Sequence, residues 1–159
     1  MTDVTVRPVS PDQHDAVMHY FDMVAYADNP NWSKCYCAER LVEDYDSRTR
    51  EQNRAFRSQL IQSAKANEGA IDPAVGAIMC FVVAPDQRRQ GVATALLDAA
   101  VEHLRKRGMR TAEAYPWLGE IDPSRWSQSM YVGPLSMYVK AGFAVEEKHE
   151  DFAVVRLAL

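Results

Sequence analysis

The segment "RRQGVATALLDAA", residues 88–100, joins a basic turn to the start of a helix. This helix start has no capping side chain of the usual kind, and its two arginines face a helix end that favours negative charge. About four backbone N–H groups at a helix start lack partners within the helix, and small residues at Gly91 and Ala93 leave them accessible. The segment therefore predicts a site for a bound phosphate, whose charge matches the arginines. The alternative is that Gly91 and Ala93 serve only close packing of helix against strand.

The elements on either side of this turn predict a parallel pair of strands. Residues 74–85, "AVGAIMCFVVAP", form a nearly continuous apolar run that is typical of a strand covered on both faces. The helix is expected from Gly91 to about Arg107, and "RTAEAYP" at 110–116 is the next expected strand. A strand, a crossover helix and a second strand form a right-handed unit whose two strands are parallel.

The rest of the chain predicts helices before this unit and an antiparallel pair after it. Two amphipathic helices are expected in the first half, and the arginines of the second are expected on a solvated face. The expected elements are a strand at 4–9, helices at 11–25 and 47–66, a long loop at 117–133, a short helix at 134–142, and antiparallel strands at 143–150 and 152–159.

Composition limits the class of protein. The 159 residues, 47% hydrophobic and 25% charged, suit one domain spanning residues 1–159. The net charge of −4 argues against a general nucleic-acid surface. The sequence shows neither a secretory signal nor an apolar run of the roughly 20 residues that cross a membrane. We therefore expect a cytoplasmic protein that binds neither nucleic acid nor membrane.

The three cysteines do not predict a metal site. Cys35 and Cys37 form a C-x-C pair, but no second pair and no nearby histidines complete a tetrahedral set, and Cys80 stands apart. We expect buried or loop thiols and no metal.

The turn at residues 88–93 lacks the lysine and hydroxyl residue of a Walker loop and the three glycines of a dinucleotide fingerprint. It resembles the pyrophosphate turn of the GNAT N-acetyltransferase superfamily, in which Arg or Gln is followed by two residues, Gly, one residue, and Gly or Ala. The segments "CYC", "EAYP" and "GPLSMYVKAGF" resemble one bacterial branch of that superfamily. The resemblance covers residues 74–159 well and residues 1–66 in the order of elements.

The resemblance implies an α/β (α+β) fold with a mixed, mostly antiparallel sheet, a splayed parallel pair of strands at its centre, and flanking helices. One departure concerns the segment before the central strand, where the family places two more antiparallel strands. Here only "NEGAIDP" separates Ala66 from Ala74, so this hairpin is missing or truncated, through loss or through residues absent from the given sequence. An exposed sheet edge would then need pairing within the fold or in a strand-sharing homodimer.

The resemblance also implies acetyl-CoA as co-substrate. Backbone amides from Gln90 to Thr94 would hold its pyrophosphate, with the Thr94 hydroxyl added, and backbone at Phe81 to Val83 would pair with the pantetheine arm. The implied cofactor-binding residues are Phe81, Val82, Val83, Arg88, Arg89, Gln90, Gly91, Val92, Ala93 and Thr94.

The implied reaction moves the acetyl group directly to a primary amine of a small molecule or peptide. Such an amine, with a pKa of about 10.4, is neutral in only about one molecule in 2,500 at pH 7, so a base is useful. Glu113 is the first candidate, with an ion pair to Arg110 or another arginine as the alternative. Tyr138 occupies the family's acid position and would donate a hydrogen bond to the departing thiolate. Its alternative role is aromatic packing under Phe143.

Aromatic residues of the long loop are candidates for the acceptor pocket, or else ordinary core residues. They are Trp117, Trp126 and Tyr131. The cysteines allow an alternative to direct transfer, in which a cysteine first accepts the acetyl group and forms an acyl-enzyme. The GNAT-like motif places none of the three cysteines at the thioester. The rival function is a non-catalytic acyl-CoA-binding or protein-interaction module on a degenerate fold of the same kind.

Overall fold

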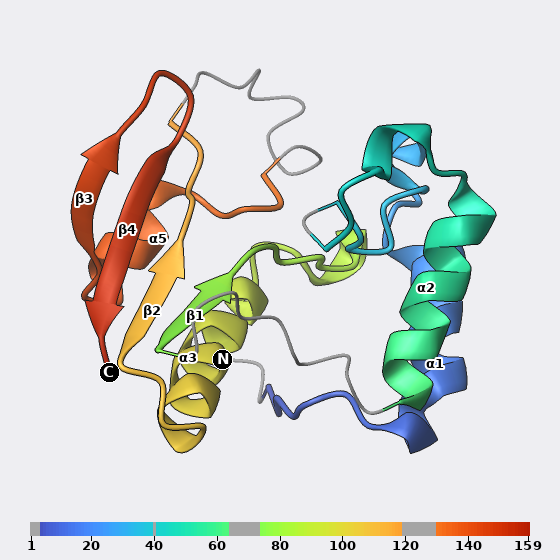
Figure 1. Ribbon diagram of the computed structural model, residues 1–159, viewed down its shortest axis with the longest axis horizontal. Helices are drawn as coiled ribbons and strands as arrows, with labels where there is room; N and C mark the ends of the chain where they lie inside the picture. The colour runs from blue at the N-terminus through green and yellow to red at the C-terminus, as the bar shows by residue number, and fades with distance from the viewer. Residues whose placement is uncertain (1–3, 40, 64–73, 119–129) are drawn as a thin grey trace. The chain divides into compact units, whose positions relative to one another are not determined.

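A computed structural model describes residues 4–39, 41–63, 74–118 and 130–159 (Figure 1). The chain divides into two compact units, each with its own hydrophobic core. The sheet unit comprises Met1–Val6, Gly69–Val83 and Gln87–Leu159, and the helical unit comprises Arg7–Glu68 and Ala84–Asp86. A single domain over residues 1–159 stays a prediction.

The sheet unit is built on four strands in the order β1-β2-β4-β3. These are β1 (Val75–Ile78), β2 (Thr111–Ala114), β3 (Ala144–Lys148) and β4 (Ala153–Ala158). β1 and β2 are parallel, whereas β2 with β4 and β4 with β3 are antiparallel. The predicted mixed, mostly antiparallel sheet with one parallel pair is confirmed, but that pair lies at one edge of the described sheet and not at its centre.

The outer side of β1 has no strand partner among the described residues. The Thr111 amide donates to the Ala74 carbonyl at 3.1 Å, so the alternation along a strand directs the backbone groups of Val75 and Ala77 away from β2. The expected strand at residues 4–9 is wrong, since these residues form no strand in the structure. Pro8 within this stretch lacks an N–H, which weakens strand pairing there. The place of the expected hairpin, residues 64–73, lies outside the described residues.

β1 is shorter than the apolar run predicted. It ends at Ile78, because β2 ends at Ala114 and is soon followed by Pro116, which has no N–H for a ladder bond. Beyond β1, the Phe81 amide donates instead to the Tyr131 carbonyl at 2.6 Å. The chain after β1 therefore leaves β2, in line with the predicted splay.

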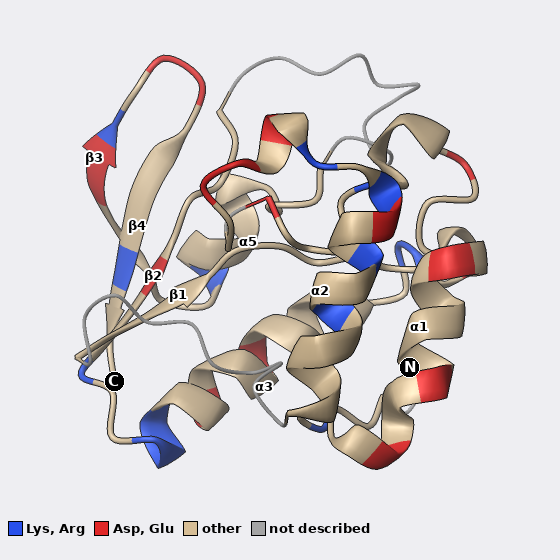
Figure 2. Cartoon of the chain, turned by 45° about the vertical axis from the view of Figure 1, so that its right-hand side comes forward, with Lys and Arg blue, Asp and Glu red and all other residues tan. Residues whose placement is uncertain are grey.

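Two helices of the sheet unit pack on one face of the sheet. They are α3 (Val92–Lys106) and α5 (Leu135–Lys140). Leu97 and Val101 of α3 are buried in one core with Ile78 and Val155 of the strands. Basic residues gather at the C-terminal end of α3, where they favour the helix dipole (Figure 2).

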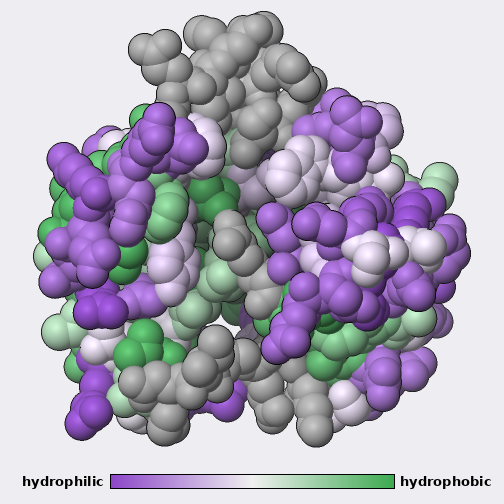
Figure 3. Space-filling model, turned by 45° about the horizontal axis from the view of Figure 1, so that its top comes forward, coloured by the Kyte–Doolittle hydropathy of each residue, from purple (hydrophilic) through white to green (hydrophobic). Residues whose placement is uncertain are grey.

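The β3 edge of the sheet is exposed and carries charged residues. Every residue of β3 is exposed, and hydrophilic side chains gather over β3 and its following turn (Figure 3, left). Such charged edges discourage pairing with other chains.

The helical unit contains α1 and α2 with several short helical turns. Its elements are η1 (Pro11–Gln13), α1 (His14–His19), η2 (Tyr20–Val24, a π-helix), η3 (Pro30–Trp32), η4 (Tyr45–Ser47) and α2 (Arg50–Gln62), and η5 (Pro85–Gln87) joins the two units. The helix expected at 11–25 is present as consecutive 3₁₀, α and π segments over 11–24. The helix expected at 47–66 is present as α2, and residues 64–66 of that expectation lie outside the described residues. Met18, Tyr36 and Ile61 form the core of this unit.

One arginine of α2 is buried, which contradicts the expected solvated face. Arg57 is 8% exposed, and its guanidinium donates to the carbonyls of Tyr36 at 2.8 Å and Cys37 at 2.9 Å. Tyr36 and Cys37 both have left-handed backbones, with φ of 46° and 54°. Carbonyls of such an irregular loop have no ladder partners, so a buried donor from the neighbouring helix is needed.

Candidate functional site

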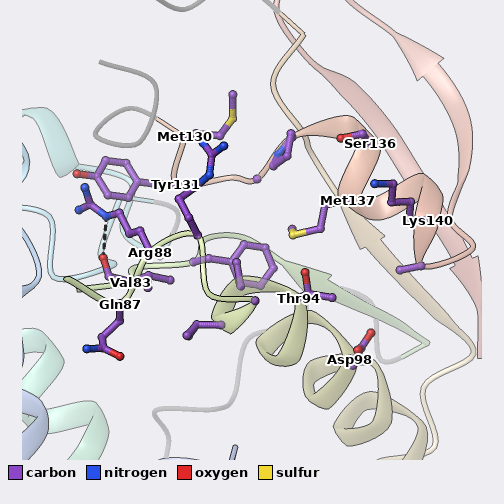
Figure 4. A pocket seen from close by; sticks show the side chains of 18 residues that line it. Val83, Gln87, Arg88, Thr94, Asp98, Met130, Tyr131, Ser136, Met137 and Lys140 are labelled. Atoms are coloured by element: carbon purple, nitrogen blue, oxygen red, sulfur yellow. Dashed lines mark hydrogen bonds between the residues drawn. The ribbon is translucent and has the colours of Figure 1, made fainter. Parts of the chain in front are cut away.

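A cavity of about 490 Å³ lies in the sheet unit (Figure 4). The chain after β1, the first turns of α3, the segment at 130–134 and helix α5 form its walls. It is lined by Phe81, Val83, Gln87, Arg88, Arg89, Gly91, Val92, Ala93, Thr94, Asp98, Met130, Tyr131, Gly133, Pro134, Ser136, Met137, Lys140 and Ala141.

The N-terminus of α3 opens into this cavity. Gly91 caps the helix with a left-handed backbone (φ 85°) and no side-chain capping bond, and the Ala95 amide makes a first-turn bond to its carbonyl at 3.0 Å. The amides of Val92, Ala93 and Thr94 precede that bond and have no partner within the helix. A Cβ added at residue 91 would meet no atom within 4 Å, so the helix start at Gly91 is not covered by packed atoms. The arrangement suits an anion.

Two arginines complete this end of the cavity. The Arg88 Nε donates to the Val83 carbonyl at 3.0 Å, which ties the turn to the chain after β1 (Figure 4, dashed line). Arg89 has a left-handed backbone with φ of 62°, a conformation that costs a residue with a side chain roughly 1–2 kcal/mol. Strain of this kind gathers at functional sites. Positive charge and backbone strain therefore coincide at the cavity.

Most of the expected cofactor-binding residues line this cavity, but Val82 and Gln90 do not. The Phe81 amide was expected to be open to a pantetheine arm, but it donates to the Tyr131 carbonyl instead. Tyr131 lines the cavity as well, so this expected acceptor residue shares the space of the expected cofactor residues.

Tyr138 lies beneath the cavity rather than on its wall. Its side chain is fully buried, and its ring lies edge-on to that of Phe143 with 5.4 Å between the ring centroids. Its hydroxyl donates a hydrogen bond to the Val132 carbonyl at 2.7 Å. Burial, with a smaller effect from Cys80, raises the pKa of Tyr138 well above its ordinary value. The structure thus shows the packing alternative, and a catalytic role of Tyr138 stays a prediction.

Glu113 lies away from the cavity wall, on the sheet face opposite the buried Ala112 and Ala114. It accepts hydrogen bonds from the Tyr115 hydroxyl and from Arg156, whose Nε lies 2.7 Å away. Burial acts to raise the pKa of Glu113, but the hydrogen bonds and the Arg156 charge outweigh it and lower the pKa. This favours the ion-pair alternative, with Arg156 in place of Arg110.

Of the other expected acceptor residues, Trp117 makes bridges to Pro134 and Phe152 and does not line the cavity. Trp126 lies outside the described residues. The sequence analysis did not predict the wall formed by α5, including Lys140, because α5 and α3 are far apart in the sequence although they line the same cavity. Asp98 could have been predicted from the sequence as a residue of the cavity wall, since it follows Thr94 by one helical turn and lies on the same helix face.

The described residues offer neither a metal-ion site nor a membrane-spanning helix. They contain no group of three or more His, Cys, Asp or Glu side chains placed to hold a metal ion. Within the same residues, no helix combines the length and apolar character needed to cross a bilayer.

Comparison with known proteins shows which family this part of the chain resembles. The model of the "Acetyltransferase (GNAT) family" matches residues 60–131, which include β1, the arginine turn and α3. This part of the chain is similar to the GNAT acetyltransferase family. The predicted resemblance is thereby confirmed over residues 60–131, and it supports the acetyltransferase class and acetyl-CoA, the acetyl donor of GNAT enzymes.

Solved structures show the same fold. The crystal structure of PaiA N-acetyltransferase from Thermoplasma acidophilum in complex with coenzyme A aligns with a TM-score of 0.56 at 13% identity, covering 99% of this chain and 100% of that one. Ard1 from Thermoplasma volcanium aligns with a TM-score of 0.50 at 16% identity, covering 98% and 97%. No curated protein matches this sequence.

Proposed function

We propose that the cavity binds acetyl-CoA with its diphosphate at the N-terminus of α3, and that the protein transfers the acetyl group directly to a primary amine of a small molecule or peptide. The observation that carries this proposal is the open helix start flanked by Arg88 and Arg89 on one cavity wall. PaiA, which has the same fold, was crystallised with coenzyme A, and this supports the choice of ligand.

The chemistry of the wall fits the parts of this ligand. The amides of Val92 to Thr94 and the two arginines offer hydrogen bonds and positive charge to a diphosphate. Phe81, Met130 and Met137 offer an apolar surface to an uncharged thioester arm. Because the Phe81 amide is already bonded, the arm would rely on contacts other than that donor.

Proton transfer sets two requirements. The acceptor ammonium must lose a proton, which costs roughly 4.6 kcal/mol at pH 7 for a pKa of about 10.4. The lowered pKa of Glu113 makes it a poor base, so the proton lost by the ammonium would pass to solvent water, and the thiolate would take up a proton from solvent after it leaves. The departing thiolate is a weaker base than a phenolate, so Tyr138 would assist it by hydrogen bonding without giving up its proton.

Tyr138→Phe tests that assistance. Catalytic hydrogen bonds are often unformed before substrate binds, so the bond to Val132 does not exclude the role. We expect kcat to fall about 100-fold with little change in coenzyme affinity. If kcat is retained while the free energy of unfolding falls by about 1 kcal/mol, Tyr138 serves packing alone.

Gly91→Glu tests the coenzyme site. A glutamate there would place bulk and negative charge before the α3 amides, so binding of acetyl-CoA, measured by calorimetry, should be lost. Gly108→Glu is the matched control, because Gly108 has a similar left-handed backbone (φ 75°) and open surroundings but does not line the cavity. Unchanged affinity in the Gly91 variant would refute the assignment.

Acetyl transfer itself is tested by release of free thiol from acetyl-CoA in the presence of an amine library. The enzyme should release thiol with at least one amine. Binding of acetyl-CoA without thiol release from any amine would favour the non-catalytic acyl-CoA-binding module.

The edge of β1, which has no strand partner among the described residues, supports a strand-sharing homodimer as the assembly of this protein. Ala77 is exposed and its amide points away from β2, so Ala77→Pro should block pairing at this edge and leave the bonds to β2 in place. Light scattering should then show a dimer for the wild type and a monomer for the variant. A wild-type monomer would contradict the proposal.

A further inference from the structure

The charged residues on the cavity wall stand in two groups. Arg88 and Arg89 lie by the start of α3, whereas Lys140 comes from the end of α5 and Asp98 from the second turn of α3. Figure 4 shows Ser136 and Lys140 projecting from α5, with Thr94 and Asp98 on α3 below them. The second group therefore lies on the wall shared by two helices, apart from the arginine turn.

A ligand with two separate anionic groups matches such a wall. The proposed function, on which this inference rests, assigns coenzyme A to the cavity. Coenzyme A carries a diphosphate and, on its ribose, a 3′-phosphate monoester with a charge of about −1.5 to −2 at pH 7. The α3 amides and the arginines account for the diphosphate. The monoester needs a second cation, and Lys140 is the other cation among the described lining residues.

We propose that Lys140 binds the 3′-phosphate of the coenzyme and makes the protein discriminate between coenzyme A and 3′-dephospho-coenzyme A. The Lys140 ammonium is a compact charge on a flexible stem, which suits a phosphate monoester at an exposed site. Lys140 makes no ion pair with any other described residue, so no such bond has to break before a phosphate binds.

Asp98 sets the strength of this subsite. Its exposed carboxylate, on the facing wall, repels a phosphate and brings the net charge of the Lys140 group to zero. The subsite therefore does not attract free anions strongly, and it holds a phosphate only when the remainder of the ligand is anchored at α3.

Lys140 has one structural role to separate from this. It is the last residue of α5, where a positive charge favours the helix dipole. Loss of that role would lower stability and would weaken both ligands equally. Loss of the proposed role would weaken only the ligand that carries the 3′-phosphate.

The test is calorimetric titration of the full chain with coenzyme A and with 3′-dephospho-coenzyme A. The variants are Lys140→Met, Asp98→Asn and the control Lys148→Met, which removes an exposed charge on β3 away from the cavity. Wild type and Lys148→Met should bind coenzyme A about tenfold more tightly than the dephospho form, the lower range for one bond to a charged group. Lys140→Met should bind both with the dephospho affinity, and Asp98→Asn should widen the preference.

Each other outcome has a distinct meaning. Equal affinities in the wild type, or equal weakening of both ligands in Lys140→Met, would overturn the subsite and leave the proposed function standing. If Lys148→Met also loses the preference for coenzyme A over the dephospho form, the subsite is overturned, because any lost positive charge would then have the same effect. If neither ligand binds the wild type, the proposed function itself fails.

Discussion

Arg89 combines a strained backbone with a positive side chain at the cavity. Arg89→Gly should relieve the strain and raise the free energy of unfolding by about 1 kcal/mol, because glycine adopts positive φ freely. The same change should weaken acetyl-CoA binding through loss of the charge. Chemical denaturation and calorimetry measure the two effects.

Gln90→Gly is the control for that change. Gln90 has no positive φ, so glycine there should lower stability through the entropy of the unfolded chain, by about 0.5–1 kcal/mol. If Arg89→Gly binds acetyl-CoA as tightly as the wild type, the Arg89 charge takes no part in coenzyme binding.

At the scale of elements, contact of β1 with α3 depends on Gly76. A Cβ at this position would lie 2.2 Å from the Leu104 Cδ2 and 2.7 Å from its Cδ1. Gly76→Ala should therefore cost about 1–3 kcal/mol of stability through overpacking. Denaturant titration of the double variant with Leu104→Ala checks the cause: relief of the clash should make its loss smaller than the sum of the single losses.

The Glu113 and Arg156 pair joins β2 to β4 and predicts an acid dependence. The pKa of Glu113 is lower in the folded protein than its ordinary value near 4.3, so its ionised form stabilises the fold above that pH. This contribution is lost as the pH falls through the folded pKa. Glu113→Gln should therefore lower stability at pH 7 and flatten the decline of stability between about pH 5 and 3.

Thermal unfolding over this pH range measures the effect. Glu150→Gln, an exposed residue of the turn after β3, is the control and should leave the acid decline unchanged. A Glu113→Gln profile parallel to the wild type at all pH values would show that the pair adds no pH-dependent stability.

The elements also show what the sequence could predict. The turn at residues 88–94 was predictable because its glycine, arginines and small residues act locally on a helix start. The expected strand at 4–9 was wrong because a short alternating pattern does not reveal whether a neighbouring strand is present to pair with it. The burial of Arg57 and the α5 wall of the cavity depend on contacts between residues far apart in sequence, which no local pattern specifies.

At the scale of the molecule, the described wall of the cavity comes entirely from the sheet unit. Acetyl-CoA that binds there stabilises the folded state of this unit, by about 2.7 kcal/mol at a concentration of 100 Kd. Hydrogen exchange should therefore slow in α3 and α5 on addition of acetyl-CoA, with little change in α1 and α2, whose core is separate. Gly91→Glu, in which binding is lost, should remove the protection. Equal slowing in both units of the wild type would show instead that they unfold as one cooperative body.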